Sequence, residues 1–119
     1  MSARPTRPEV LGEQCGDEQC SLQLRVPAEL AYFPGHFPRA PVLPGAAQVG
    51  WALQLAAEHL GTPIPCRTME ALKFQRLLQP GDRVTLTLRL DRARGKLHFA
   101  YAQGELACSS GRLVLEPPA

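Results

Sequence analysis

The sequence lacks the excess of positive charge with which proteins bind nucleic acids. It has 13 lysine and arginine residues and 11 aspartate and glutamate residues, a formal net charge of +2. No segment interleaves basic and aromatic side chains in the pattern of a nucleic-acid interface. We therefore expect no nucleic-acid partner.

Cysteine pairs at metal-binding spacing are also missing. The cysteines form no C-x-x-C motif and have no histidine at ligand spacing, so we expect no metal site and no cofactor. They are Cys15, Cys20, Cys66 and Cys108. We interpret them as reduced thiols of a reducing compartment, whereas in a secreted protein they would pair. Residues 1–8 contain no apolar signal-peptide core, which favours a cytoplasmic location.

A segment able to cross a membrane is absent as well. Residues 40–57 carry no charge, but prolines, glycines and glutamines interrupt them, which leaves far fewer than the ~20 apolar residues of a span. The length of 119 residues predicts one domain whose core buries about 65% of the unfolded surface. We expect residues 1–19 to be a loosely ordered lead-in and residues 20–119 to be a single domain.

The periodicity of apolar residues predicts an α+β domain. Five segments have the pattern of strands. They are residues 20–26, 65–78, 84–91, 97–102 and 106–115. Residues 44–60 predict one helix that has no charge before Glu58 and ends at Gly61. A helix that is apolar on nearly all sides is buried, and here only a curled sheet can bury it, so we expect about five antiparallel strands wrapped round one long central helix.

Residues 32–45 predict a stiff loop that carries one titratable ring, His36. Four prolines in this segment fix φ and restrict the residues before them. Because Phe33 and Phe37 flank His36, the loop would hold the imidazole in one orientation at the edge of an apolar cavity. A general base requires such an arrangement. His36 is therefore a candidate catalytic base, the alternative being an ordinary loop histidine bonded to the backbone.

Pro44 and Gly45 mark the start of the predicted helix. A proline followed by Gly, Ala and Ala leaves backbone N–H groups without side-chain bulk around them. A carbonyl or oxyanion could approach these donors closely, and a thioester carbonyl would be polarised there. Alternatively, the proline only starts the helix and the glycine only leaves room for packing, and this explains the pair equally well.

The string His36-Phe37-Pro38-x-x-Pro41-x-x-Pro44-Gly45 resembles the signature of the 3-hydroxyacyl-acyl-carrier-protein dehydratases of the hotdog fold. Its extension, Gln48-x-x-Trp51-Ala52, most resembles the small stand-alone members found with aryl polyene and related polyketide-like biosynthesis. The resemblance covers about residues 20–116 and implies a hotdog fold.

The resemblance also implies an activity and a partner. It implies a lyase that removes water from a 3-hydroxyacyl thioester to give a trans-2-enoyl thioester, with His36 as the base and the Gly45 N–H as the enolate-stabilising donor. The substrate would be carried on the phosphopantetheine of acyl carrier protein, in fatty acid or polyketide-like biosynthesis. In this family the two chains of a dimer build each site together. Candidate substrate-binding residues are Phe33, Phe37, Val42, Pro44, Trp51 and Gln54.

One position departs from the family pattern. The family has an Asp or Glu fourteen residues after the catalytic histidine, and that position is Gly50 here. Gln54 matches the glutamine that the family carries one helical turn later, so the alignment holds. A general acid contributes about 10²–10⁴-fold to a rate, so its loss leaves a slow enzyme unless a substitute exists. The substitute would be His36 itself, Gln54 or an ordered water that orients the hydroxyl, or another subunit.

Three functions are compatible with this site. The first is an active homodimeric dehydratase, and the second is a weak or inert acyl-binding subunit that pairs with a paralogue bearing the acid. The third is a hotdog thioesterase, which also needs a helix carboxylate and is therefore disfavoured by Gly50. Acyl carrier proteins are acidic, so basic residues near the site would steer them. The available ones are Lys73, Arg76, Arg83, Arg92, Arg94 and Lys96.

Overall fold

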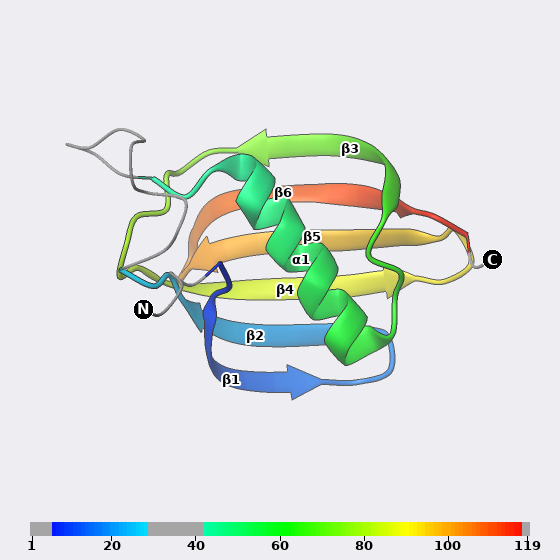
Figure 1. Ribbon diagram of the computed structural model, residues 1–119, viewed down its shortest axis with the longest axis horizontal. Helices are drawn as coiled ribbons and strands as arrows, with labels where there is room; N and C mark the ends of the chain where they lie inside the picture. The colour runs from blue at the N-terminus through cyan, green and yellow to red at the C-terminus, as the bar shows by residue number, and fades with distance from the viewer. Residues whose placement is uncertain (1–5, 29–41, 118–119) are drawn as a thin grey trace, which may run out of the picture.

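The protein is one antiparallel sheet with a single helix across one face, as a computed structural model describes it for residues 6–28 and 42–117 (Figure 1). The helix is α1 (Gly45–Leu60). The strands are β1 (Glu9–Cys15), β2 (Gln19–Arg25), β3 (Cys66–Phe74), β4 (Arg83–Asp91), β5 (Lys96–Gln103) and β6 (Leu106–Leu115). Their order across the sheet is β1-β2-β4-β5-β6-β3. The predicted α+β class and the helix are confirmed.

The sheet has six strands where the sequence predicted about five. The additional strand is β1, in a region expected to be a loose lead-in. Its side chains are almost all exposed, so it lacks the alternation by which strands are recognised. Pairing with β2 holds it in the sheet, with a register shift between Val10 and Gly12 and an ion pair of 2.9 Å between Arg25 and Glu9.

A disulfide joins Cys15 and Cys20, which corrects the interpretation of these cysteines as reduced thiols. The antiparallel register of β1 and β2 places the two residues directly opposite each other, with their Cα atoms 4.1 Å apart. The sequence concealed this pair because β1 itself was not predicted. Among the described residues Cys66 and Cys108 remain free thiols.

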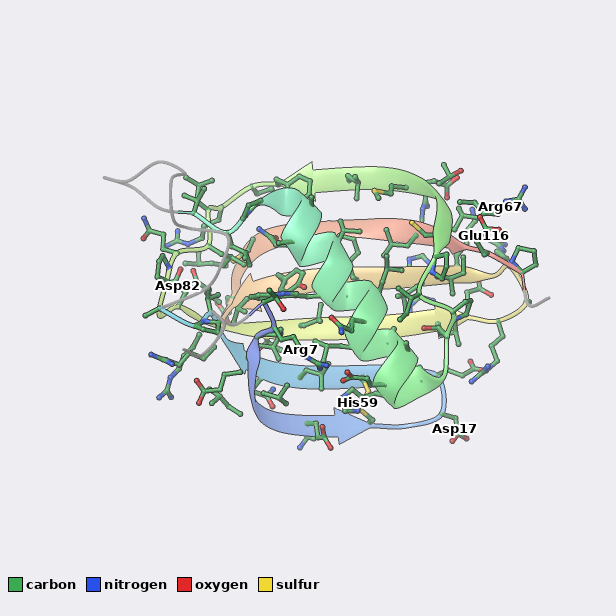
Figure 2. The ribbon with its side chains drawn as sticks, viewed as in Figure 1. Arg7, Asp17, His59, Arg67, Asp82 and Glu116 are labelled. Atoms are coloured by element: carbon green, nitrogen blue, oxygen red, sulfur yellow. A yellow bond between two sulfur atoms is a disulfide. The ribbon has the colours of Figure 1, made fainter. Side chains whose placement is uncertain are left out.

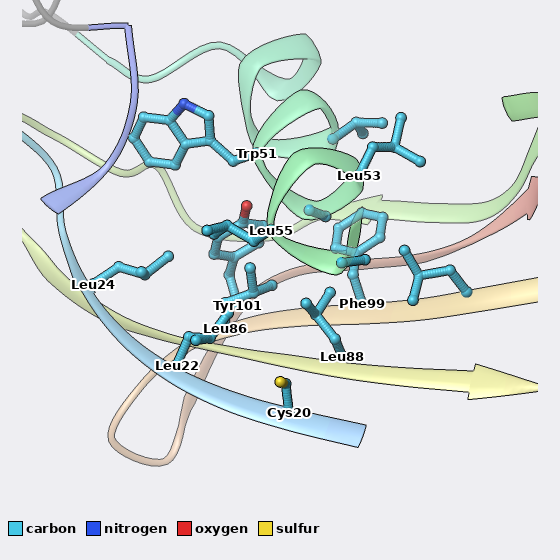
Figure 3. Packing of buried hydrophobic residues seen from close by; sticks show 14 of the residues in the cluster. Cys20, Leu22, Leu24, Trp51, Leu53, Leu55, Leu86, Leu88, Phe99 and Tyr101 are labelled. Carbon is cyan, nitrogen blue, oxygen red and sulfur yellow. The ribbon is translucent and has the colours of Figure 1, made fainter. Parts of the chain in front are cut away.

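The core lies between α1 and the concave face of the sheet (Figure 3). Alternate residues of the central strands point toward the helix, among them Leu22, Leu86 and Phe99. The helix covers them with a buried face centred on Trp51 and Leu55, which are 2% and 1% exposed. Burial of these apolar surfaces is the main force that holds the helix on the sheet. Within the described ranges no helix is long and apolar enough to cross a lipid bilayer.

The β3 strand forms one edge of the sheet and is largely uncovered. It pairs with β6 alone among the described strands, and Met69, Leu72 and Phe74 on it are 49%, 38% and 50% exposed. A row of exposed apolar side chains on a strand with an unpaired edge is typical of a surface that contacts another polypeptide.

Candidate active site

The predicted site residues fall into two groups. His36, Phe33 and Phe37 lie outside the described residues, so their predicted roles stay predictions. The others lie along α1 or just before it: Val42, Pro44, Gly45, Trp51 and Gln54. The structure therefore locates the helix side of the candidate site.

The N-terminus of α1 presents free backbone donors. Pro44 is the N-cap residue, with φ −60° and ψ 149°, and no side chain of the described residues caps the helix. The Pro44 carbonyl accepts the N–H groups of Ala47 and Gln48, both at 3.1 Å. The Gly45 and Ala46 N–H groups have no backbone acceptor within residues 6–28 and 42–117. This end of the helix also carries partial positive charge and suits an oxyanion or polarised carbonyl.

The neighbouring strand approaches Gly45 closely. A Cβ atom at this position would lie 2.8 Å from Cζ of Phe74, at the end of β3. Carbon atoms do not approach so closely, so any larger residue would displace the aromatic ring or the helix start. Phe74 is half exposed, so its ring lies at the surface next to Gly45. Sequence reasoning missed this residue because only the sheet order brings β3 to the helix N-terminus.

A buried polar network holds the first turns of α1 on the sheet. Gln48 is 3% exposed, and its Oε1 accepts a hydrogen bond of 2.6 Å from the Ser109 hydroxyl. Its Nε2 donates to the Leu43 carbonyl at 3.3 Å, and its backbone carbonyl accepts the Tyr101 hydroxyl at 2.7 Å. Burial raises the pKa of Tyr101, which keeps the phenol protonated as a donor.

This network depends on an irregularity in the pairing of β6 with β5. The register of β5 and β6 shifts between Tyr101 and Ala102, so that Cys108 and Ser109 are both buried although they are neighbours on one strand. A bulge of this kind re-aims a side chain, and here Ser109 points inward to Gln48. Gln48 appeared in the sequence as part of a motif, without its structural role.

Gly50 lies on an exposed part of α1. A Cβ atom added there would meet nothing within 4 Å among the described atoms, so the position has room for a longer side chain. Gln54, one helical turn later, is half-buried. Trp51 is 2% exposed, and its Nε1 donates to the Thr6 carbonyl at 3.0 Å, so it packs beneath the segment that leads into β1. Its predicted contact with substrate stays a prediction.

The candidate docking residues separate into two groups at opposite ends of the sheet. Arg76 and Arg83 are near the helix N-terminus, because the segment between β3 and β4 contacts the chain just before α1 through a Leu43 N–H to Leu78 carbonyl bond of 2.7 Å. Arg92, Arg94 and Lys96 lie in or beside the β4–β5 turn, toward the end where Figure 2 labels Arg67 and Glu116.

The two groups also differ in pairing. Arg92, Arg94 and Lys96 form ion pairs with Glu18, Asp91 and Glu70 at 3.6, 3.8 and 2.9 Å. Lys73, Arg76 and Arg83 contact no carboxylate of the described part of the chain. Positive charge at the helix N-terminal end is therefore available for an acidic partner.

An antiparallel sheet curled against one central helix defines the class of hotdog-fold proteins. Residues 12–112 match the family of ApeI-like proteins, described as ApeI dehydratase. A 3-hydroxyacyl-[acyl-carrier-protein] dehydratase FabZ of Oenococcus oeni is 32% identical over 87% of this chain and 82% of its own length. The chain therefore belongs to the ApeI-like dehydratase family.

Solved structures agree with this assignment and confirm the predicted hotdog fold. One chain of the dehydratase heterocomplex ApeI:P from Xenorhabdus doucetiae is 31% identical, with a TM-score of 0.84 over 93% of this chain and 99% of that one. A protein from Erwinia carotovora subsp. atroseptica is 33% identical, with a TM-score of 0.79 over 92% of this chain and 96% of that one.

Proposed function

We propose that this protein dehydrates 3-hydroxyacyl thioesters carried on acyl carrier protein to trans-2-enoyl thioesters, in fatty acid or aryl polyene-type biosynthesis. The observation that carries the proposal is the uncapped N-terminus of α1 at Gly45, in a chain that belongs to a dehydratase family. A cytoplasmic location, where acyl carrier protein is found, is part of the same proposal.

In the proposed reaction the Gly45 N–H donates to the thioester carbonyl oxygen. His36 removes the proton from the carbon next to that carbonyl, and the negative charge that develops on oxygen is stabilised by the helix N-terminus. The carbon–oxygen bond at position 3 then breaks, a double bond forms between carbons 2 and 3, and the hydroxyl group leaves with a proton as water. Phe33, Phe37 and Val42 would line the apolar path of the acyl chain.

The proton for the leaving hydroxyl needs a source other than position 50. His36 is one candidate, because it holds the abstracted proton and could return it on the same face of the substrate. Gln54 is the second, because its half-buried amide lies one turn from Gly50 and could orient the hydroxyl or a water. The third source is a carboxylate of another subunit.

A composite site with a second subunit is the alternative function, and two observations favour it. The exposed apolar edge of β3 ends at Phe74, beside Gly45, so a chain bound there would border the site. The similar chain from Xenorhabdus doucetiae belongs to a dehydratase heterocomplex. In this alternative the protein binds the acyl chain and the partner supplies the acid.

Dehydration of a 3-hydroxyacyl thioester by purified wild type, His36→Ala and Gly50→Glu distinguishes the two. If wild type turns over and His36→Ala abolishes turnover, the protein is a self-sufficient dehydratase. If wild type is inert and Gly50→Glu restores turnover, it is one half of a composite site. Turnover that is unaffected by His36→Ala would exclude the proposed base.

A further inference from the structure

The far end of α1 gathers metal-binding side chains from three elements. Cys15 ends β1, Cys20 lies on β2, and His59 lies in the last turn of α1. One ligand atom from each lies within 4.8 Å of the other two. Figure 2 shows the bond between the two sulfur atoms beside the labelled His59. No spacing in the sequence relates these residues, because the fold brings His59 to the hairpin.

A fourth suitable group is adjacent. Oε2 of Glu13, on β1, lies 3.5 Å from Nε2 of His59. Two thiolates, an imidazole and a carboxylate are ligands that Zn²⁺ accepts in tetrahedral sites, and thiolates favour soft divalent cations over Mg²⁺ or Ca²⁺. If His59 and Glu13 formed only a surface ion pair, the two cysteines would not need to lie beside them.

We propose that in the reduced protein Cys15, Cys20, His59 and Glu13 form a binding site for Zn²⁺, and that the disulfide is the oxidised, metal-free state of the same site. The inference does not rest on the proposed dehydratase function, because the site lies at the opposite end of α1 from Gly45 (Figure 1).

The placement of Cys15 and Cys20 suits both the zinc-bound and the disulfide state. The two cysteines occupy directly opposite positions of the β1–β2 ladder, so their side chains project on the same face. Two Zn–S bonds of ~2.3 Å at the tetrahedral angle separate the sulfurs by about 3.8 Å, which rotation about the side-chain bonds can supply once the disulfide opens. Cys15 and Glu13 are exposed and give the ion an entry path, while Cys20 is buried as the floor of the site.

Atoms and electrons balance when the site changes between the zinc-bound and the disulfide state. Metal binding releases the two thiol protons as each sulfur bonds to Zn²⁺. For the reverse step a small-molecule disulfide accepts two electrons and two protons and becomes two thiols, the Cys15–Cys20 bond forms, and Zn²⁺ leaves. In a reducing cytoplasm the thiol state, and hence the metal site, would dominate. Bound metal would then join the β1–β2 hairpin to the last turn of the helix.

Cobalt(II) is the probe we would use first, because a tetrahedral thiolate site gives it a sulfur-to-metal charge-transfer band and intense visible bands. We expect the reduced full-length protein to develop both bands at one equivalent of Co²⁺ and to lose them on addition of Zn²⁺. The same protein oxidised to the disulfide should show neither band, and re-reduction should restore them. This comparison changes no residue, so it cannot be confused with misfolding.

Variants assign the ligands. His59→Gln should weaken Zn²⁺ binding at least tenfold, and Cys20→Ser should remove at least half of the charge-transfer intensity, because one of the two thiolates is lost. Glu13→Gln should weaken binding less, since water can take the fourth position. Cys66→Ser and His98→Gln are matched controls and should bind as wild type does. The proposal is overturned if reduced wild type shows no thiolate band, if the oxidised protein binds equally well, or if His59→Gln leaves the affinity unchanged.

Discussion

The two ends of α1 are built in opposite ways. The N-terminal end has no side-chain cap, no acidic residue in its first turn, and free N–H groups at Gly45 and Ala46 among the described residues. The C-terminal end closes at Gly61, whose φ of 70° is the left-handed conformation that ends helices. Beside it lie a disulfide, the His59–Glu13 contact and a two-point ion pair.

The comparison shows which end of α1 has backbone N–H groups without a backbone acceptor among the described residues. Restraints that hold the helix gather at its C-terminal end, whereas at its N-terminal end the Gly45 and Ala46 N–H groups have no backbone acceptor among the described residues. Such groups cost stability when they are buried unless a cap, water or a ligand satisfies them.

The largest effect is expected at Gly45. Gly45→Ala places a Cβ atom against the Phe74 ring and blocks approach of a carbonyl to the free N–H groups. We expect kcat/KM for dehydration to fall by about 100-fold, the scale of losing one oxyanion donor. The assay uses whichever form turns over, wild type or Gly50→Glu. Gly50→Ala is the control in a wild-type background, because its Cβ meets nothing and helix propensity alone favours it.

The second effect concerns the network beneath the helix start. Ser109→Ala removes the 2.6 Å bond to Gln48 and leaves a buried amide oxygen unpaired. We expect the free energy of unfolding to fall by about 1–3 kcal/mol, measured by urea denaturation. Ser110→Ala, one residue along β6 and less buried, should change it little. If both variants lost the same free energy of unfolding, the hydrogen bond between Ser109 and Gln48 would add no stability of its own.

The third effect compares the basic groups at the two ends of the sheet. Arg76→Glu with Arg83→Glu reverses unpaired charge near Gly45 and should raise KM for the acyl-carrier-protein substrate by about tenfold, through lost electrostatic steering. Arg92→Glu with Arg94→Glu makes the same charge change at the other end and should leave KM nearly unchanged. An equal rise in both would indicate a response to net charge alone.

The smallest effect is expected for the ion pair at the helix C-terminus. Arg7 contacts both carboxylate oxygens of Glu58, at 2.6 and 2.9 Å. The hydrogen bond from Arg7 lowers the pKa of Glu58, so the stabilisation is full above the ordinary glutamate pKa of about 4.3 and is lost as the pH falls through the lowered value. Both side chains are well exposed, so we expect only ~0.2–1 kcal/mol.

Thermal unfolding of Glu58→Gln beside wild type, at neutral pH and again below the pKa of Glu58, measures this contribution. The two proteins should differ at neutral pH and converge in acid. A difference that persists in acid would show that the substitution acts through something other than the charge of Glu58.

Much of the architecture could be predicted from local patterns. Alternation in β2, β4 and β5 and the uncharged segment that became α1 gave their positions within a few residues, because side-chain burial on one face is visible in sequence. The exposed edge strand β1 left no such pattern and was missed. The helix side of the site was anticipated at Pro44 and Gly45, whereas Phe74 and Ser109 were not.

The sequence by itself determined the class of fold, the helix with its bare proline–glycine start, and the family signature, since each is encoded by residues close together along the chain. Only the tertiary structure decided that Phe74 closes on Gly45, that Ser109 reaches Gln48, and that Cys15, Cys20 and His59 meet. These contacts depend on the strand order and on a bulge in β6, which bring together residues that are distant in the chain. Long-range pairing of this kind follows from the packing of the whole sheet, which no local pattern records.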